Sequence, residues 1–433
     1  MDLIGPFLFL PFLVFLVMGV PIAFSLGLAC LVFLLFSGTH IPTLILVTEM
    51  YTAVDSFALL ALPMFVLTGE LLNRCDLTEK LVEAARLLIG WLKGGLAHVN
   101  IVTSMFFAGI SGSVLADAAS IGPILIPAMI RERYPAAFSA AVTGASSVIG
   151  AIIPPSIPLI IVGGQLQISI GGLFAAGVVP GVLVGLFLMI VAYTICAARG
   201  YGHVHRFEGV AATSLGTARA LPALMIPVLI LGGILSGIFT PTEAGAIAVA
   251  YTLLVGAFYY RSLDGGKLRA SLVATARVTA SALLIVAAAI VFGRILTFYR
   301  VPQEILDLLL SITDSRVILA LIVILFFLFM GAFMDAVANM IILGPLLMPI
   351  AVEGLGMHPI QFGVFLMIGL LLGVITPPLG LILFVVSPIA GVALERTALA
   401  VLPFLAAEIA VLLLVVFVPD VTLALPRAVG LVE

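Results

Sequence analysis

The sequence predicts an all-α polytopic membrane protein built from two inverted repeats, and three observations lead to this fold class. First, 63% of the 433 residues are hydrophobic and 9% are charged, with a mean hydropathy of +1.37. A soluble domain carries about 25% charged residues, so this composition excludes a soluble protein. Second, most basic residues fall on one side of the expected spans. Third, both halves of the chain carry the same glycine and proline landmarks.

Uncharged apolar stretches predict about ten crossings, because a transmembrane helix needs roughly 20 apolar residues. The alternation typical of a β-barrel is absent. The opening stretch MDLIGPFLFL has no Lys or Arg before its apolar run, so we interpret it as the first span rather than a signal peptide. The expected spans are residues 4–18, 21–37, 56–73, 137–165, 172–196, 221–238, 241–260, 276–299, 361–386 and 397–419.

The basic residues predict the orientation of these spans. Cytoplasmic loops of membrane proteins are enriched in Lys and Arg, and placing the N-terminus outside brings most basic residues together on the cytoplasmic side. Only Arg294, Arg300, Arg316 and Arg427 then lie toward the outside. The cytoplasmic set is Arg74, Lys80, Arg86, Lys93, Arg131, Arg133, Arg199, Arg206, Arg219, Arg261, Lys267, Arg269, Arg277 and Arg396.

The internal repeat is carried by matching motifs in the same order. SGSVLADAASIGPILIP (111–127) precedes GASSVIGAIIPPSIPLI (144–160), as GAFMDAVANMIILGPLLMP (331–349) precedes GLLLGVITPPLGLILF (369–384). Five crossings per half, an odd number, make the second copy inverted. We expect the first repeat at 1–197, with a re-entrant hairpin at 94–130 and a broken helix at 137–165. A cytoplasmic linker at 198–220 follows, and then the second repeat at 221–433, with a hairpin at 317–350 and a broken helix at 361–386.

The paired prolines predict that two spans are broken near mid-membrane. Proline removes a backbone donor and clashes with the preceding turn, at about 3 kcal/mol in a helix interior. Unpaired backbone groups at that depth are tolerated where they face protein or an aqueous cavity, so breaks in inverted repeats indicate a transporter's binding site. Free carbonyls suit sodium, and helix N-termini suit an anion. Pro154, Pro155 and Ser156 start one half-helix, and Thr376, Pro377 and Pro378 are the counterpart.

Each break is preceded by a segment that enters the membrane and returns. Between Lys93 and Arg131 the only Asp, Glu, Lys or Arg is Asp117, and small polar residues occupy the middle of the segment. An uncharged turn favours a re-entrant hairpin buried in protein, although charge alone leaves a full crossing open. Residues 317–350 are expected to enter from the opposite side, with their tip at residues 331–335.

Two acidic residues follow the expected tips. Asp117 and Asp335 are predicted to cap the second arm of each hairpin, where a carboxylate binds free N–H groups and suits the helix dipole. Ligation of a cation is the alternative. The hydroxyls of Ser111, Ser113 and Ser156 either belong to a site or satisfy neighbouring carbonyls, and the sequence leaves both readings open. An amphipathic stretch at 77–93 fits a helix in the membrane plane or a packed connector, and 263–275 fits a shorter one.

Several motifs together resemble one known family. FALLALPMFVLTGELL, GISGSVLADAASIGPILIPAM, GAIIPPSIPLIIVGG, FAAGVVPG and GIFTPTEAGAIAVAY are similar to the large membrane subunit, of DctM type, of a tripartite ATP-independent periplasmic (TRAP) transporter. The resemblance covers nearly the whole chain. It implies an elevator mechanism, sodium coupling, a small four-helix membrane partner that is not fused to this chain, and a periplasmic binding protein that delivers organic acids. It also implies a multi-pass protein of the bacterial or archaeal inner membrane.

The resemblance also implies site residues, carried over by motif. Two sodium sites are expected at the hairpin tips and breaks, with the substrate between the tips. Because the second tip reads GAFMD where the first reads SGSVLAD, the ligands of the second site are less defined. The expected sodium ligands are Ser111, Gly112, Ser113, Gly150, Ile153, Pro154, Gly331, Asp335, Gly373, Ile375 and Thr376. The expected substrate residues are Ser113, Pro155, Ser156, Ala332, Pro377 and Pro378.

Other function classes were weighed against this interpretation. An ATP-driven pump is unsupported, because GGK at 265–267 lacks both the upstream Gly and the following Ser or Thr of a Walker loop. An intramembrane aspartyl enzyme would need Asp117 and Asp335 to meet as an acid–base pair. A passive channel can also be built from hairpins that meet at mid-membrane. A sodium/anion symporter that works without a binding protein is the fourth alternative.

Overall fold

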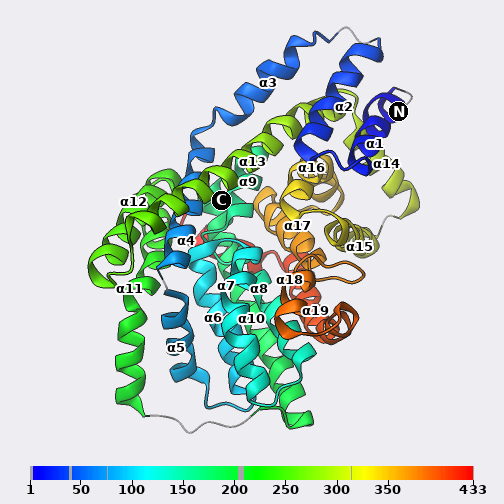
Figure 1. Cartoon of the computed structure of the whole chain (residues 1–433). Helices are drawn as coiled ribbons and strands as arrows, with labels where there is room; N and C mark the ends of the chain where they lie inside the picture. Colours follow the sequence, from blue (N-terminus) through cyan, green and yellow to red (C-terminus); the bar gives the residue numbers. More distant parts are fainter. Residues whose placement is uncertain (1–2, 39–40, 76, 203–208, 314, 433) are drawn as a thin grey trace.

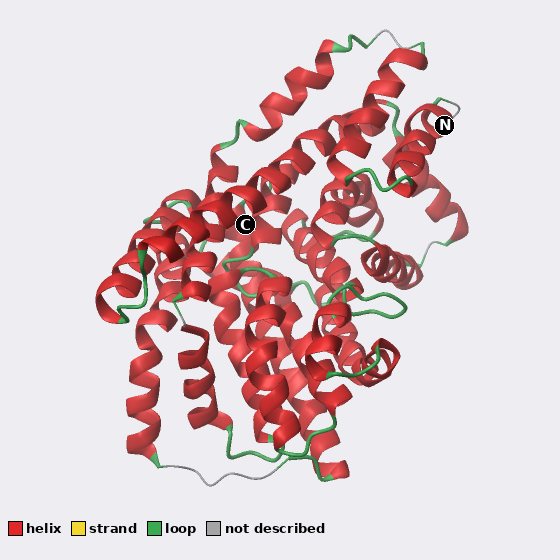
Figure 2. Cartoon of the chain, in the orientation of Figure 1, coloured by secondary structure: helices red, strands yellow, loops and turns green. Residues whose placement is uncertain are grey.

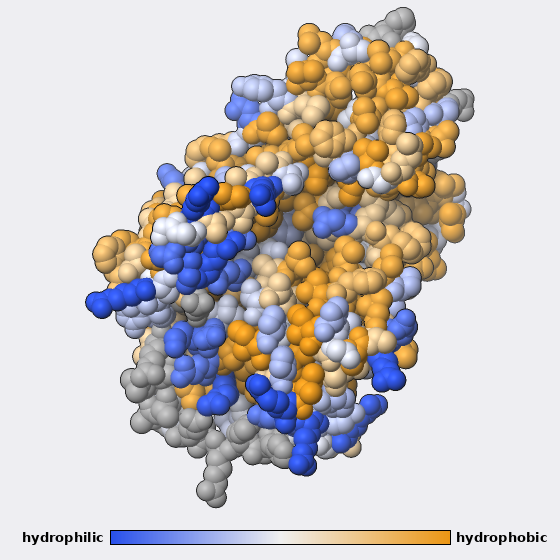
Figure 3. Space-filling view, in the orientation of Figure 1, coloured by the Kyte–Doolittle hydropathy of each residue, from blue (hydrophilic) through white to orange (hydrophobic). Residues whose placement is uncertain are grey.

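All the regular secondary structure in the described part of the chain is helical, and loops connect the helices (Figure 2). The structure is a computed structural model, and it describes residues 3–38, 41–75, 77–202, 209–313 and 315–432. Within these residues, eight helices are long and apolar enough to cross a membrane, or nine when the bent pair α8–α9 counts as one span. Hydrophobic side chains cover most of the face seen in Figure 3, and hydrophilic ones gather toward its lower left. The prediction of an all-α polytopic membrane protein is confirmed.

Within the described ranges the helices follow one another along the chain (Figure 1). In the first half they are η1 (Gly5–Phe9), α1 (Leu10–Val17), α2 (Ile22–Phe36), α3 (Leu44–Val54), η2 (Phe57–Leu60), α4 (Ala61–Arg74), α5 (Leu77–Ile89), α6 (Gly95–Ser111), α7 (Val114–Arg131), α8 (Ala136–Ile152), α9 (Ile157–Leu166) and α10 (Ile170–Arg199). In the second half they are α11 (Val210–Leu235), α12 (Pro241–Leu254), η3 (Val255–Tyr259), α13 (Gly265–Phe298), α14 (Val301–Ile312), α15 (Arg316–Phe333), α16 (Ala336–Pro349), η4 (Ile350–Gly354), α17 (Pro359–Gly373), α18 (Leu383–Ala390), α19 (Leu394–Phe417) and α20 (Asp420–Ala428).

Capping side chains begin several of these helices. At α12, Thr240 accepts a hydrogen bond from the Glu243 N–H at 3.3 Å, and the Glu243 carboxylate accepts one from the Thr240 N–H at 2.8 Å. This reciprocal pair satisfies two of the free donors at the helix start, and Pro241 follows directly as the first helical residue. At α13, Asp264 accepts from the Lys267 N–H at 2.7 Å. Both helices therefore begin where short-range sequence signals place them.

The two helices that precede the breaks form the centre of the bundle. Every residue of α8 from Phe138 onward is buried, and so is every residue of α17 from Ile360 onward. A helix that is buried on all sides needs small or apolar residues all round, and the sequences of α8 and α17 have them. The α6–α7 hairpin packs against α8, and the α15–α16 hairpin packs against α17. The two halves thus repeat one arrangement of hairpin and interrupted helix.

Three connections differ from their expected form. Residues 38–55, which lie between the expected spans 21–37 and 56–73, contain α3, which packs along α13 and forms the Glu49–Arg294 ion pair at 3.2 Å. Residues 263–275, expected to hold a separate surface helix, are continuous with the span that follows, because α13 runs for 34 residues. The linker expected at 198–220 contains the start of α11 at Val210, and residues 203–208 lie outside the described part.

The amphipathic stretch at 77–93 forms α5, whose apolar side packs against α6 and α11. Leu81, Ala84 and Ala85 on that side are buried, whereas Glu79 and Arg86 are exposed. Helices α6 and α11 cover this side of α5, and Leu88 is the large apolar side chain of α5 that stays exposed. The arrangement therefore favours the packed connector of the two alternatives.

Candidate functional site at the hairpin tips

The α6–α7 tip is joined to the first broken helix through backbone atoms. Gly112 at this tip has a φ of +60°, and its carbonyl accepts a hydrogen bond from the Ile157 N–H at 3.2 Å. A Cβ at Gly112 would lie 2.7 Å from the Pro155 carbonyl oxygen. Both the left-handed conformation and this close approach require glycine. The tip is therefore seated directly on the break between α8 and α9.

The first break is short and internally satisfied. Helix α8 ends at Ile152, α9 begins at Ile157, and the two axes differ by 43°. Ser156 caps α9 by accepting from the Leu159 N–H at 3.3 Å, and its hydroxyl donates to the Ala151 carbonyl at 2.5 Å. Its side chain thus bridges the break from within, fully buried. Of the two readings for the Ser156 hydroxyl, the geometry favours satisfying neighbouring backbone groups.

The cap of α7 is Ser113 and not Asp117. The Ser113 hydroxyl accepts from the Ala116 N–H at 3.4 Å. Asp117 lies one turn further on, is 1% exposed, and neither of its carboxylate oxygens has a hydrogen-bond partner in the described part of the chain. It packs against Gly150, where an added Cβ would lie 3.0 Å from the Asp117 Cβ. The capping role expected for Asp117 is corrected here, because the serine at the tip stands one turn closer to the free N–H groups.

A buried polar network connects α6 with α8 beneath this tip. The Asn100 amide donates to the Thr143 hydroxyl at 2.7 Å, and the Ser146 hydroxyl donates to Asn100 Oδ1 at 3.1 Å. Ser104 extends the chain to Ser146 at 3.1 Å. All four side chains are almost completely buried. The spacing of these polar residues, three or four apart within apolar helices, is the sequence signal of this network, which is absent from the predicted site.

The α15–α16 tip is seated on α17 in a corresponding way. A Cβ on Gly331 would lie 2.4 Å from the Leu370 carbonyl oxygen, and one on Gly373 would lie 2.4 Å from the Gly331 Cα. Asp335 caps α16, with Oδ1 accepting from the N–H groups of Val337 and Ala338 at 3.0 and 3.1 Å. Asn339 donates to the Met330 carbonyl at 2.9 Å. The break that follows is longer than the first, running from Gly373 to Leu383.

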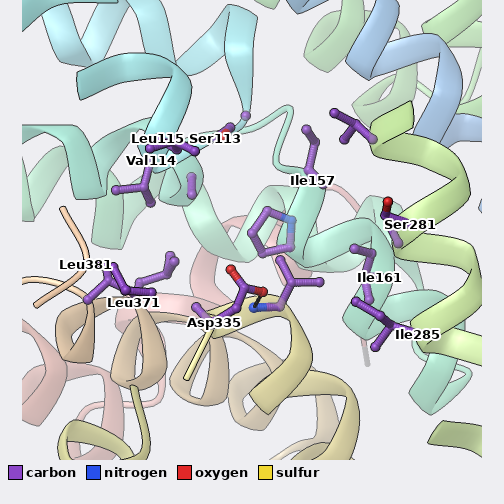
Figure 4. Close-up of a pocket in the computed structure, with 18 of the residues that line it drawn as sticks. Ser113, Val114, Leu115, Ile157, Ile161, Ser281, Ile285, Asp335, Leu371 and Leu381 are labelled. Carbon is purple, nitrogen blue, oxygen red and sulfur yellow. Dashed lines mark hydrogen bonds between the residues drawn. The ribbon is translucent and has the colours of Figure 1, made fainter. Parts of the chain in front are cut away.

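A cavity of about 500 Å³ lies between the two tips and the long helix α13 (Figure 4). Ser113 and Leu115 come from the first tip, and the Asp335 carboxylate comes from the second. Helix α9 also joins the two halves, because the Gln165 side-chain amide donates to the Ile341 carbonyl of α16. The remaining lining residues are Gly112, Val114, Ala151, Ile157, Pro158, Ile161, Arg277, Val278, Ser281, Ala282, Ile285, Ala336, Val337, Leu371, Val374, Leu381 and Ile382.

The structure separates the predicted site residues into two groups. Gly112, Ser113 and Asp335 line the cavity. The others lie at the contacts between tips and breaks or within the breaks. That second group is Ser111, Gly150, Ile153, Pro154, Pro155, Ser156, Gly331, Ala332, Gly373, Ile375, Thr376, Pro377 and Pro378.

Helix α13 contributes a wall of the cavity that is absent from the predicted site. Arg277, Ser281 and Ile285 follow one another at intervals of four residues, so they share one helix face, and all three line the cavity. Arg277 was assigned only to the cytoplasmic set of basic residues. The visible signal was an arginine and a serine one turn apart at the start of an apolar stretch.

Replacing Asp335 with alanine should lower the stability of the protein by about 1 kcal/mol, the usual cost of losing an N-cap side chain. Asparagine at the same position can still accept from the Val337 and Ala338 N–H groups, so Asp335→Asn should lose much less. Thermal unfolding of the purified variants in detergent measures both. Equal losses for the two substitutions would show that the charge, and not the cap, stabilises α16.

Comparison with known proteins identifies the family to which this chain belongs. The family model described as "Tripartite ATP-independent periplasmic transporter, DctM component" matches residues 9–421. The sialic acid TRAP transporter large permease protein SiaM of Vibrio cholerae is 38% identical over 415 residues, covering 94% of this chain and 95% of that protein. The C4-dicarboxylate TRAP transporter large permease protein DctM of Pseudomonas aeruginosa is 38% identical over 409 residues, with the same coverage.

Two further matches extend the comparison. The isethionate TRAP transporter permease protein DctMQ of Oleidesulfovibrio alaskensis is 39% identical over 416 residues, which cover 96% of this chain. The match spans 65% of that longer protein. Among solved structures, the YdaH transporter of Alcanivorax borkumensis superposes with a TM-score of 0.61 over 87% of each chain, at 16% identity. At that identity the likeness concerns the fold alone.

Proposed function

Because this chain belongs to the DctM family of TRAP transporter large permeases, a family of secondary transporters of organic acids, we propose that it takes up a small organic acid by sodium-coupled transport. Its relatives are named as transporter permeases, and it is not an enzyme. The observation that carries the proposal is the cavity at which both hairpin tips meet α13. In a transporter built from inverted repeats, the substrate site lies where the interrupted segments of the two repeats converge.

Sodium is proposed to bind at the two contacts between tips and breaks. At the first, the Ser113 carbonyl oxygen faces Gly150, where an added Cβ would lie 3.3 Å from it. At the second, residues 331–335 face residues 373–376, whose backbone leaves the helix at the break. Backbone carbonyls at such interruptions are suitable ligands for a hard cation. Sodium at these two places would hold each tip against its break, and so shape the cavity between them.

An elevator movement is proposed from the composition of the cavity wall. Hairpins and broken helices supply most of it, and α13 supplies the rest. Hairpins α6–α7 and α15–α16 each pack on a central helix, and α18 and α19 connect the second half to α8, so the two units would move together as one transport domain. Helix α13 packs on α2, α3 and α4 and belongs to the proposed scaffold. The cavity would then lie on the boundary along which the transport domain slides.

The proposed assembly includes two further polypeptides. A small four-helix membrane subunit would complete the scaffold, and a periplasmic binding protein would deliver the substrate. Both proposals come from the family, as does a location in the bacterial or archaeal inner membrane. Two other functions could use the same cavity between the tips. One is a sodium/anion symporter that works without a binding protein, and the other is a passive channel.

Sodium coupling predicts concentrative uptake that follows the sodium gradient. Proteoliposomes holding the chain with its membrane partner and binding protein should accumulate labelled substrate when sodium is higher outside. With equal sodium on both sides, accumulation should stop at equal concentrations, because no gradient remains to drive it. Replacing sodium by potassium is the matched control. Accumulation that is unchanged without a sodium gradient argues against the coupling, and equilibration alone under every condition indicates a channel.

The proposed orientation places the N-terminus outside and α5 in the cytoplasm. The native cysteines Cys30, Cys75 and Cys196 are buried, so an introduced thiol can be followed against a low background. A thiol reagent that cannot cross the membrane should label Ser311→Cys on α14 in intact cells. It should label Lys80→Cys on α5 only after the membrane is opened. The reverse pattern would invert the topology.

A further inference from the structure

Helix α13 presents one polar and one apolar part to the cavity. Arg277 is the first residue of α13 that lines the cavity. Ser281 lies one helical turn later, and Ile285 lies one turn after Ser281. Figure 4 shows Ser281 and Ile285 across the cavity from Leu371 and Leu381. Arg277 is exposed and forms no ion pair with any residue in the described ranges. Its guanidinium is therefore free to bind an anion.

The cavity contains one group of each charge. Arg277 is its only cationic lining residue, and Asp335 is its only acidic one. The Oδ1 atom of Asp335 is occupied by two backbone N–H groups, which leaves Oδ2 able to accept a hydrogen bond from a ligand. A guanidinium binds a carboxylate through two parallel hydrogen bonds, which fixes both its position and its orientation. One carboxylate on a ligand is thus matched, whereas a second one would find no further cation and would share the cavity with the Asp335 carboxylate.

The rest of the lining is apolar. Of the twenty lining residues, only Ser113, Ser281, Arg277 and Asp335 carry polar side chains. Every hydroxyl or carboxylate that a ligand buries without a partner is penalised, so an apolar wall disfavours polyhydroxylated and doubly charged acids. An apolar carbon body gains from the same surface. The lining therefore selects by the number of charges and hydroxyls on the ligand.

We propose that this cavity binds a monocarboxylate with an apolar carbon body and one hydrogen-bond donor, and that Arg277 of α13 holds its carboxylate. The donor group, a hydroxyl or an amine, binds Oδ2 of Asp335. This inference rests on the proposed function and assigns a substrate class and a specificity-determining residue to the same cavity. The relatives named above for sialic acid and C4-dicarboxylates have substrates outside this class.

The position of Arg277 also gives it a defined place in the transport cycle. No charged residue lies between Arg277 and Arg294, a stretch of roughly 25 Å in an α-helix and close to the thickness of the hydrocarbon core. Arg277 is therefore at one edge of the membrane, which is the cytoplasmic edge in the proposed orientation. Because α13 belongs to the scaffold, Arg277 holds the substrate only while the transport domain is at that edge.

The test is thermal unfolding of the full chain, co-purified with its membrane partner, in sodium chloride with millimolar acids. The probes are 2-hydroxy-4-methylpentanoate, succinate and gluconate. The hydroxy acid should raise the unfolding midpoint by about 2 °C or more, the size expected for a ligand well above its dissociation constant. Succinate and gluconate should raise it by less than half as much. Equal shifts for all three acids, or no shift for the hydroxy acid, would overturn the proposal.

Four variants locate the effect. Arg277→Gln should lose the shift caused by the hydroxy acid, and Arg277→Lys should keep part of it, which shows that the site still folds. Arg269→Gln, an exposed arginine on α13 that does not line the cavity, should behave as the native chain. Asp335→Asn should bring succinate closer to the hydroxy acid, because it removes the repelling charge. A full shift in Arg277→Gln contradicts the assignment even when sodium-driven uptake by the complex is established.

Discussion

Proteoliposomes that contain this chain and its small membrane partner should take up roughly a hundredfold less micromolar substrate when the binding protein is absent. The cavity has one cationic residue and a mostly apolar wall, so it lacks the convergent polar groups that capture a dilute ligand tightly. No separate soluble domain stands in the described ranges, where α3 and the other short helices pack on the bundle. A docked binding protein would raise the local substrate concentration at the cavity far above that in bulk.

Uptake is measured as the initial rate with labelled acid under a fixed inward sodium gradient. A heat-denatured sample of the same binding protein is the control for protein added to the outer face. Uptake at full rate without the native binding protein would make the chain a stand-alone sodium/anion symporter. Docking without any gain in uptake would remove the proposed delivery role.

Replacing Gly373 with alanine should abolish most of the uptake. The new Cβ would lie 2.4 and 2.5 Å from the Cα and C atoms of Gly331, and 2.9 Å from the Ala332 nitrogen. These are backbone atoms, which cannot move aside as a flexible side chain can, so the second tip must separate from its break. Overpacking of this kind destabilises by about 1–3 kcal/mol. Uptake should fall further than this loss of folding stability alone would cause, because the proposed sodium site spans the same contact.

Gly144→Ala provides the matched control. Gly144 lies in α8, which is as buried as α17, but its added Cβ would only meet side-chain carbons of Val386, Ile382 and Leu383 at 3.5 to 3.7 Å. This variant should retain nearly native uptake and stability. Unfolding midpoints and initial uptake rates are compared for both variants. Native uptake in Gly373→Ala would show that contact between the second tip and its break is not needed for transport.

Local sequence signals predicted the hairpins and breaks closely. Proline and glycine act on their own turn of helix, so Pro154 and Pro377 mark the breaks without reference to the rest of the chain. The hairpin expected at 94–130 corresponds to α6 and α7, and the one at 317–350 corresponds to α15 and α16. The family resemblance, carried by several of the same motifs, was confirmed.

Two site features escaped prediction because competition between neighbouring groups decided them. The side chains of Ser113 and Asp117 can both accept a hydrogen bond from a free N–H at the start of α7. The path of the backbone at Gly112 places the Ser113 hydroxyl next to the Ala116 N–H, so Ser113 is the cap. Ser156 had a hydroxyl suited to a ligand, but the bend between α8 and α9 brings it to the Ala151 carbonyl. Such choices depend on distances of a few ångströms, which residue order alone does not specify.

The sequence by itself determined the membrane class and indicated where the helices are interrupted, since composition and proline placement act over one span or less. The tertiary structure alone decided which residues share a cavity. Ser113, Arg277 and Asp335 are far apart in the chain and come from the two hairpins and α13, so long-range helix packing brings them together. An arginine beside an apolar stretch satisfies the rule for cytoplasmic charges whether or not it faces a cavity. Only the packing of α13 against α9 and α16, which makes it a wall of the cavity between the tips, gives Arg277 a second role.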